Sequence, residues 1–517
     1  MGADLQVRKV LLLEFNEITW TLVEPMIARG KLPMFERLRR EGAWASPRSV
    51  DLPPHMDPWV TWVTVHTGVE RAVHGATILE QDASTIKAAR TWDYALDAGK
   101  SVGVFGSISA YPPRAVPGFM VPGSFAPSSA TFPRSLEPLQ ELNRTQVQLH
   151  HRNRRGLSVP GILSQGIDLL KLGVRPSSCA AVAAQLAREL VQPHQRWRRV
   201  ALQPLINLDV FEALYRRTRP DYATWHTNHA AHYMHHYWRA MDDSKFPSRS
   251  SEEERRKYGG AVEHGYRICD LLLGRFMALI DDDTILVVAS SMGQQPFVSG
   301  AYPEGKIVAR FKDIASVLRL MRARGVTELV PVMLPQWNVR LPDADERARV
   351  KALWENAGFV GKVSRSAFKA VETGDILTVT PVCLAQPDPD ARYFFPGAPD
   401  ARPEGYPIHE LFALDAPSPK QGMHHPTGLL MLWGKGIRAG VEIADTTTLD
   451  IAPTLLSLLG IPVPDIMTGR VLSEAWDGGR SRRSVQQAPP ELARAVAENL
   501  LRLRQIAPGS RVLAERP

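Results

Sequence analysis

The chain has 517 residues, of which 44% are hydrophobic and 22% charged, a balance typical of an ordinary soluble globular protein with one large core or two to three domains. Its net charge of +8 can attract an anionic ester, a glycan or a lipid headgroup, but the basic residues are not interleaved with aromatic ones, which argues against a nucleic-acid partner. The charge is concentrated in four clusters: residues 150–155, 196–199, 216–219 and 480–483.

The cysteine content excludes a disulfide framework. Cys179, Cys269 and Cys383 are odd in number and widely spaced, so neither paired bridges nor a cysteine-based zinc site is expected. The apolar run before Glu14 is too short for a signal peptide. The sequence contains no run of about 18 apolar residues, so no membrane span is predicted. We therefore expect a cytoplasmic protein.

Apolar strands alternate with amphipathic helices along much of the chain. Residues 10–13 form a continuous apolar run, and apolar residues then recur at helical spacing as far as Ile27. This pattern predicts a buried strand that leads into a helix, the opening of an α/β fold. Further strands are expected over residues 102–106, 283–289 and 429–433, and further helices over residues 31–38, 86–98 and 252–280.

Two stretches interrupt this alternation. Residues 128–219 are rich in Arg, Pro and His, and we interpret them as an inserted basic cap because the alternation resumes at Tyr222. A second insertion is expected before Gly422, and an amphipathic helix over residues 490–504 in the polar tail. The predicted segments are core 1–127, cap 128–219, core 220–300, insertion 301–421, core 422–478 and tail 479–517.

The stretch over residues 57–75 delivers hydroxyl groups into a run rich in Trp and Val. Thr64 and Thr67 precede a break at Gly68, and His74 follows it. Threonine hydroxyls readily bond back to their own helix, so the local pattern by itself favours a core helix that contains threonine.

A second group of polar residues follows a short strand that ends near Thr227. His229, His232 and His236 recur at spacings of three and four residues, which places them on one face of a helix. Three imidazoles on one face could hold a transition metal. The local alternative is a histidine-rich helix that packs through hydrogen bonds.

Together these blocks resemble the alkaline phosphatase superfamily, in its type I phosphodiesterase and nucleotide pyrophosphatase branch. The resemblance implies an alkaline-phosphatase-like three-layer α/β/α sandwich with a mostly parallel sheet and inserted caps. It also implies that Thr64 attacks phosphorus or sulfur. The blocks that carry it are residues 30–43, the Thr64-x-x-Thr67-Gly68 and His74-Gly75 pattern, Asn228-x-x-x-His232, and residues 422–428 and 449–472.

The departures from the family pattern concern its two-metal site, which has three aspartates and three histidines. The aspartates correspond to Asn16, Asn228 and Ser291, and one histidine corresponds to Met292. The other two histidines remain as His232 and His424. We therefore expect no paired zinc site, and either no metal or one divalent ion held weakly by His232 and His424.

Three hypotheses follow. In the first, the chain is a hydrolase or group transferase for an anionic phosphate or sulfate ester: Thr64 attacks, and His232 or His424 acts as base or acid. This requires an imidazole within reach of Thr64. The substrate would be bound by Asn16, Asn228, Ser291 and His229.

The second hypothesis is a catalytically inactive pseudo-phosphodiesterase that binds an anionic ligand or a partner protein. It explains the lost metal ligands simply, but not why the replacements are polar. The third hypothesis moves the chemistry to a rebuilt site with a different set of metal ligands. Its candidate residues are Glu14, Glu17, Asp57, His66, His229 and His409.

Overall fold

A computed structural model describes residues 8–79, 81–151, 166–298, 309–331, 336–360, 365–381, 390–414 and 420–476. Within this part of the chain, a central eight-stranded sheet organises the fold. Its strands are β1 (Lys9–Phe15), β2 (Ala43–Ala45), β3 (Val102–Phe105), β4 (Gly118–Val121), β5 (Tyr222–Thr227), β6 (Thr284–Ala289), β19 (Leu430–Trp433) and β20 (Val441–Ile443). The order is β20-β2-β19-β6-β1-β5-β3-β4, and β19 alone runs antiparallel to its neighbours.

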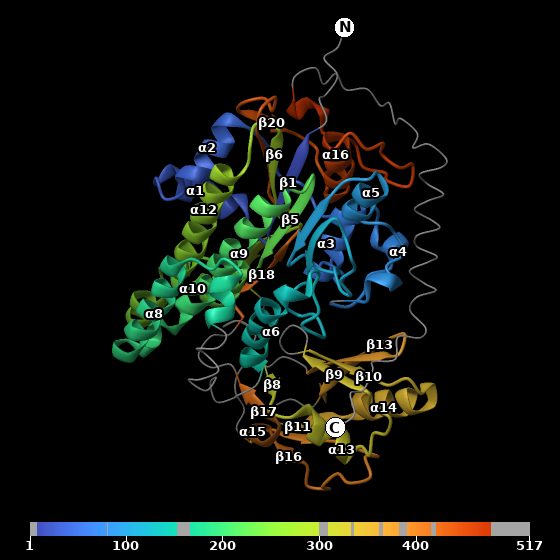
Figure 1. Ribbon diagram of the computed structural model, residues 1–517. Coiled ribbons are helices and arrows are strands. Elements are labelled where there is room, and N and C mark those ends of the chain that lie inside the picture. Colours follow the sequence, from blue (N-terminus) through green and yellow to red (C-terminus); the bar gives the residue numbers. More distant parts are fainter. Residues whose placement is uncertain are drawn as a thin grey trace.

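Helices cover both faces of this sheet, which gives three layers (Figure 1). One face carries α1 (Trp20–Ala28), α2 (Pro33–Glu41), α9 (Leu202–Thr218), α10 (His229–Met241) and α12 (Ala261–Leu279). The other face carries α3 (Pro58–Thr67), α5 (Thr91–Asp97) and α16 (Ile451–Leu458). The predicted α/β fold with a mostly parallel sheet in a three-layer sandwich is confirmed.

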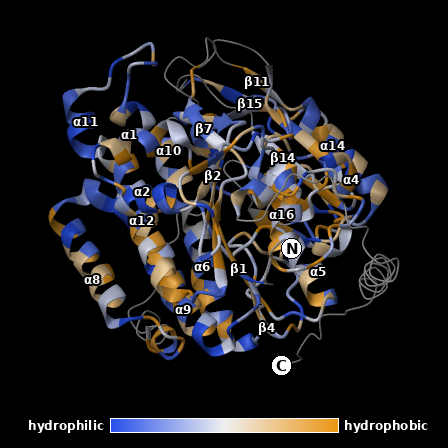
Figure 2. Cartoon of the chain, turned by 90° about the horizontal axis from the view of Figure 1, so that it is seen from above, coloured by the Kyte–Doolittle hydropathy of each residue, from blue (hydrophilic) through white to orange (hydrophobic). Residues whose placement is uncertain are grey.

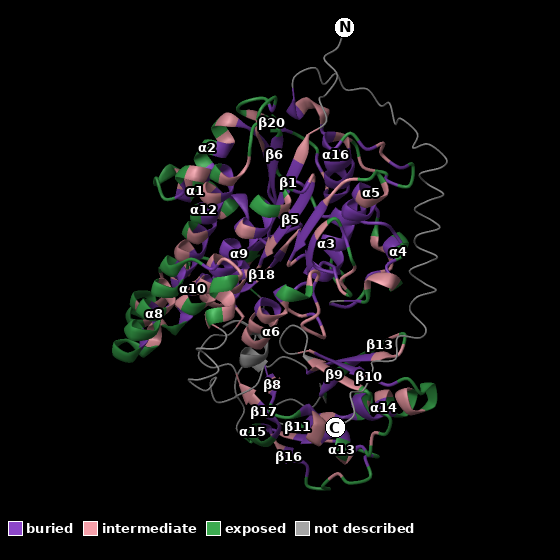
Figure 3. Cartoon of the chain, in the orientation of Figure 1, coloured by how far each residue is buried: buried purple, intermediate pink, exposed green. Residues whose placement is uncertain are grey.

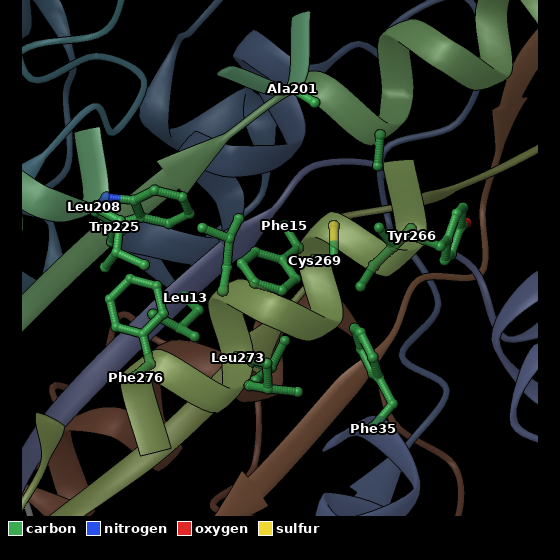
Figure 4. Close-up of a cluster of buried hydrophobic side chains, with 14 of the residues drawn as sticks. Leu13, Phe15, Phe35, Ala201, Leu208, Trp225, Tyr266, Cys269, Leu273 and Phe276 are labelled. Atoms are coloured by element: carbon green, nitrogen blue, oxygen red, sulfur yellow. The ribbon is translucent and has the colours of Figure 1, made fainter. Parts of the chain in front are cut away.

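The alternating side chains of β1 explain the two layers. Leu11 and Leu13 belong to the core under α9 and α12, whereas Val10 and Leu12 belong to the core under α3 and α16. In the first core, the ring of Phe15 contacts those of Phe35 and Trp225, and Trp225 contacts Phe276 of α12 (Figure 4). The central strands are buried along their length, as Figure 3 shows.

The described residues between 309 and 414 form a smaller unit with a hydrophobic core of its own. It lies beside the main sheet, below it in Figure 1. Its helices are α13 (Ile314–Leu320), α14 (Ala344–Asn356) and α15 (Ile408–Leu411). Its strands are β8 (Ala309–Phe311), β9 (Glu328–Pro331), β10 (Trp337–Arg340), β11 (Gly358–Val360), β12 (Arg365–Ser366), β13 (Phe368–Thr373), β14 (Ile376–Pro381), β15 (Arg392–Phe394), β16 (Tyr406–Pro407) and β17 (Phe412–Leu414).

The predicted cap over residues 128–219 contributes to the main core where it is described. Leu208 and Phe211 of α9 are buried against the sheet. Figure 2 shows α8 at the outer edge of this helical layer. The remaining elements of the main body are α4 (Arg71–His74), α6 (Glu137–His151), α8 (Pro176–Val191), α11 (Glu252–Tyr258), the ribbon strands β7 (Gly293–Pro296) and β18 (Gly422–His425), and short 3-10 turns at Ala83–Thr85, Arg134–Leu136, Pro193–Ala201, Thr448–Asp450 and Ser473–Ala475.

Some sequence expectations are modified. The single helix predicted over residues 252–280 is two helices, α11 and α12, because the chain turns at Gly259 and Gly260. Cys383, the helix predicted over residues 490–504 and the cluster at residues 480–483 lie outside the described residues. Among the helices that are described, none combines the length and the apolar character needed to cross a bilayer.

Candidate functional site

A buried glutamate stands in the turn that follows β1. Glu17 has a φ of 61°, in the left-handed region that residues with a side chain rarely adopt. Its side chain is 0% exposed. Such a conformation costs on the order of 1–3 kcal/mol and is typical of functional sites. The turn also lies at the carboxyl ends of parallel strands, where α/β folds usually bind their ligands.

His235 of α10 approaches this carboxylate with a defined tautomer. Its Nδ1 lies 3.0 Å from the carbonyl oxygen of Gly422. A carbonyl only accepts, so Nδ1 carries a hydrogen, and in the neutral form of the ring Nε2 carries a lone pair. That Nε2 lies 3.2 Å from Glu17 Oε2.

His424 of β18 repeats this arrangement from the other side. Its Nδ1 donates to the carbonyl oxygen of Met56 at 2.7 Å, and its Nε2 lies 3.6 Å from Glu17 Oε1. The Nε2 atoms of His235 and His424 are both buried, and neither has a hydrogen-bond partner among the described residues. When both imidazoles are neutral, two lone pairs and a carboxylate face one another.

These three side chains fit a divalent cation. Their ligand atoms all lie within 4.8 Å of one another. The two measured separations from Glu17 are close to the edge of about 3.3 Å expected when ligands surround zinc tetrahedrally at about 2.0–2.1 Å. Imidazoles that ligate metals usually donate their second nitrogen to a carbonyl or a carboxylate, as both do here.

The protonation states agree with this assignment. Burial by itself would raise the pKa of Glu17, but His424 and His235 outweigh it and hold that pKa at about 2. Burial lowers the pKa of His424 to about 4, against the opposing effect of Glu17. At neutral pH the carboxylate of Glu17 is therefore anionic and the imidazole of His424 is neutral, which are the forms that bind metal.

Asp57 borders the site at the start of α3. Its Oδ1 lies 3.6 Å from His424 Nδ1, and its side chain is 32% exposed. Burial, with a contribution from Glu17, raises the pKa of Asp57 to about 6, while Lys420 and Lys369 oppose that rise. Asp57 is therefore a carboxyl group that solvent reaches and that titrates near neutral pH.

Asn16 links the strand end to this group. Its Nδ2 lies 3.0 Å from Glu17 Oε1 and 2.7 Å from Asn228 Oδ1. Its Oδ1 accepts a hydrogen bond of 2.8 Å from the indole nitrogen of Trp62. Asn16, Asn228 and His424, predicted from the sequence as site residues, therefore gather around Glu17.

Ser291 occupies a different part of the site. Its hydroxyl lies 2.8 Å from that of Thr61 in α3, and both side chains are buried. Trp62 and Thr61 thus connect α3 directly to the ends of β1 and β6 through Asn16 and Ser291.

Thr64 lies one turn further along α3 and is 0% exposed. Its hydroxyl donates to Asp51 Oδ2 at 2.6 Å and lies 3.0 Å from His74 Nε2. His74 Nδ1 accepts from the backbone N–H of Ala76, so Nε2 carries the hydrogen and donates to Thr64. The imidazole beside Thr64 is therefore His74, where the sequence hypothesis required His232 or His424.

The two other predicted histidines have different surroundings. His229 bonds to Thr227 Oγ1 at 2.8 Å and to the carbonyl oxygen of Gly265 at 3.1 Å, and burial lowers its pKa to about 4. The rings of His232 and His236 lie 4.5 Å apart. His229 thus packs against α12, while His235, which was not in the predicted trio, reaches Glu17.

A second buried carboxylate, Glu14, lies within β1 on the side of α3. Its oxygens lie 3.3 Å from His66 Nε2 and 3.0 Å from His226 Nδ1, and Ser107 donates to it at 2.6 Å. Burial by itself would raise the pKa of Glu14, but the two imidazoles lower it to about 2. Trp62 packs on the rings of both His66 and His226, so this cluster contacts the indole at the site.

Glu17 and Asp57 are among the residues of the third sequence hypothesis, whereas His235 is in none of the three. The available signal for Glu17 was a polar residue at the end of a buried strand. No local signal separated His235 from the other histidines of its helix, because all four lie within two turns. His409, also in the third hypothesis, lies in α15 of the smaller unit.

Comparisons with known proteins give distant structural relatives only. No protein-family model matches the sequence, and no curated protein matches it. A crystal structure of phosphonoacetate hydrolase from Sinorhizobium meliloti 1021 in complex with phosphonoformate shares 13% identity, with 89% of this chain and 100% of that chain covered and a TM-score of 0.41. Murine ectonucleotide pyrophosphatase/phosphodiesterase 5 shares 10% identity, with 88% and 95% covered and a TM-score of 0.40. At these values, the function has to be inferred from the side chains of this chain.

Proposed function

We propose that the chain hydrolyses an anionic ester, or transfers a group from it, with one divalent metal ion bound by Glu17, His235 and His424. The observation that carries the proposal is the convergence of two buried Nε2 lone pairs on a buried carboxylate. Without a cation, those nitrogens would pay the desolvation cost of an unmet hydrogen bond, about 1–3 kcal/mol each.

The number of ligands favours catalysis over a structural role. Structural zinc sites are closed by four protein ligands, whereas catalytic sites have three and an open position. Two imidazoles and one carboxylate are a set found in catalytic zinc sites. A bound divalent ion would polarise the substrate and make water a stronger nucleophile near neutral pH.

Asp57 is the proposed proton-transfer group. It is partly exposed and lies next to His424, and its pKa of about 6 is near the range in which a carboxyl group can both accept and release a proton. The ligand set itself is unavailable for that work, because Glu17 is anionic and His235 and His424 each use Nδ1–H on a backbone carbonyl.

An anionic substrate suits the surroundings of this group. Lys420 lies near enough to both Glu17 and Asp57 to lower their pKa values, and Lys369 of β13 affects Asp57 in the same way. Asp57 is also the residue before helix α3, so the positive end of the helix dipole faces the site. The sequence resemblance to phosphodiesterases points to phosphate or sulfate esters among anionic substrates.

The family resemblance implies a different nucleophile, Thr64, and this alternative competes with the proposal. Thr64 is buried and already holds hydrogen bonds to Asp51 and His74. An attack by Thr64 would need Asp51 as the base, since His74 donates to the hydroxyl and does not accept from it. The exposure of Asp57 favours the metal-binding group as the reacting centre.

Elemental analysis and a substrate panel test the proposal together. The full chain should bind one equivalent of zinc or manganese, and Glu17→Gln and His235→Ala should each lose it, whereas His409→Ala in the smaller unit should retain it. The metal-loaded protein should cleave at least one of four p-nitrophenyl probes: a phosphodiester, a phosphomonoester, a phosphonate or a sulfate. Protein that binds no metal, or that binds it with no turnover on any probe, would overturn the proposal; the second result would favour the pseudo-phosphodiesterase.

A further inference from the structure

The indole of Trp62 fixes the orientation of a chain of amides at the site. An indole nitrogen can only donate, so the atom of Asn16 that lies 2.8 Å from it must be the carbonyl oxygen Oδ1. Asn16 therefore turns its Nδ2 the other way. Both hydrogens of that Nδ2 are used, one on Glu17 Oε1 and one on Asn228 Oδ1.

This order determines what Asn228 presents. Its Oδ1 accepts from Asn16, so its Nδ2 is the remaining donor of the pair. That Nδ2 has no hydrogen-bond partner in the described part of the chain, and Asn228 is half-buried. Asn228 is also the residue before α10, yet its side chain does not cap the helix.

We propose that Asn228 Nδ2 binds an oxygen of a tetrahedral oxyanion, the phosphoryl or sulfuryl group of the substrate, beside the ion held by Glu17, His235 and His424. This inference rests on the proposed function and names the recognition group of that site. Helix α10 begins at the next residue, His229, and its N-terminal backbone dipole favours an anion there.

The same geometry favours substrate binding over metal binding by Asn228. Its only oxygen is engaged by Asn16, and its free atom is a donor that a cation repels. Where the family resemblance would place a metal-binding aspartate, this chain presents an amide hydrogen to the substrate. Trp62 is then a positioning residue, because it acts through Asn16 and does not touch the oxyanion.

Calorimetric binding of inorganic phosphate and of sulfate to the metal-loaded full chain tests the inference. Asn228→Ala should weaken oxyanion binding about 10- to 100-fold, the range for one hydrogen bond to a charged group. Asn228→Asp should weaken it further, because it replaces the donor with a negative charge. Asn356→Asp, at an exposed position of α14, should match the unmodified chain.

Trp62→Phe separates positioning from bulk structure. It removes the indole N–H and leaves Asn16 free to turn its amide, so phosphate binding should weaken although the ring still packs on His66 and His226. Asn16→Asp has no amide to turn. The double variant Trp62→Phe with Asn16→Asp should therefore bind phosphate no more strongly than Asn16→Asp alone.

Metal content measured in the same samples distinguishes the two levels of proposal. Unchanged phosphate affinity in Asn228→Ala and Asn228→Asp, with one metal still bound, would overturn the inference and leave the proposed function standing. Absence of metal from the unmodified chain would overturn the proposed function. Loss of metal together with phosphate in Asn228→Ala would also overturn the inference, since it would make Asn228 a metal-site residue.

Discussion

His424 points its Nε2 at Glu17 Oε1, 3.6 Å away, while its Nδ1 donates to the carbonyl oxygen of Met56. The two residues are separated by about 400 positions in the sequence. They meet because His424 of β18 pairs with Gln294 of β7, whose side-chain amide donates to Glu17 Oε2. His235 completes the group through α10, which contacts the same ribbon.

The first prediction concerns the pH profile of turnover. Asp57 has a pKa raised to about 6, mainly by burial, and it must be deprotonated to act as a base. Turnover should therefore rise with pH through about 6. Asp57→Asn should lower kcat about 100-fold or more and abolish that limb of the profile. The matched change Asp465→Asn, at an exposed position, should leave the profile unchanged; an unaltered limb in Asp57→Asn would assign it to another group.

The second prediction separates Thr64 from catalysis. Thr64→Val keeps the shape of the side chain but leaves Asp51 and His74 without their shared hydroxyl. The free energy of unfolding should fall by about 1–3 kcal/mol, measured by urea denaturation. Turnover per folded molecule should change less than 10-fold. A loss of more than 1000-fold at unchanged stability would instead identify Thr64 as the nucleophile.

The third prediction concerns acid stability. The pKa of Glu14 lies near 2 in the folded state, below its ordinary value of 4.5, because His66 and His226 outweigh the effect of burial. A carboxylate with a lowered pKa stabilises the fold above pH 4.5, and this contribution is lost as pH falls toward 2. It is on the order of 3 kcal/mol. Glu14→Gln should lose it at neutral pH and unfold with a flatter acid dependence, whereas Glu355→Gln, on the surface of α14, should behave like the unmodified chain.

The fourth prediction concerns the start of α2. Asp270 of α12 accepts the backbone N–H groups of Met34 and Phe35 through Oδ1, at 2.9 and 3.0 Å. Burial raises its pKa to about 6, against the effect of those two bonds. The folded state then binds a proton more tightly than the unfolded state, so Asp270 should make stability fall as pH rises from about 4 to about 6.

Two substitutions at this position test that effect. Asp270→Asn keeps an acceptor and removes the charge, so it should abolish the pH slope with little cost at neutral pH. Asp270→Ala loses the acceptor as well and should cost about 1–2 kcal/mol, as for other helix caps. Thermal denaturation at pH 4 and pH 7 distinguishes the two variants, and equal losses in both would contradict the capping role.

Local sequence patterns predicted several elements around the main sheet, but not the division of residues 252–280 into two helices or the strands of the smaller unit. The apolar run at residues 10–13 is the centre of β1, and the run that ends at Gly68 is α3, where Gly68 takes a φ of 64° at the helix end. These elements follow from side-chain periodicity and from glycine at a left-handed turn, which neighbouring residues determine among themselves.

The order of apolar strands and amphipathic helices along the sequence was enough to predict the layered α/β architecture. Asn16, Asn228 and His424 were named as site residues only through a family resemblance. Only the tertiary structure decided that Glu17 and His235 join His424, and that Thr64 faces Asp51 and His74. The physical reason is that a helical run of histidines has several faces, and the segment packed against each face decides which imidazole meets a carboxylate. The same holds for the amides, since the orientation of Asn16 depends on an indole from another helix.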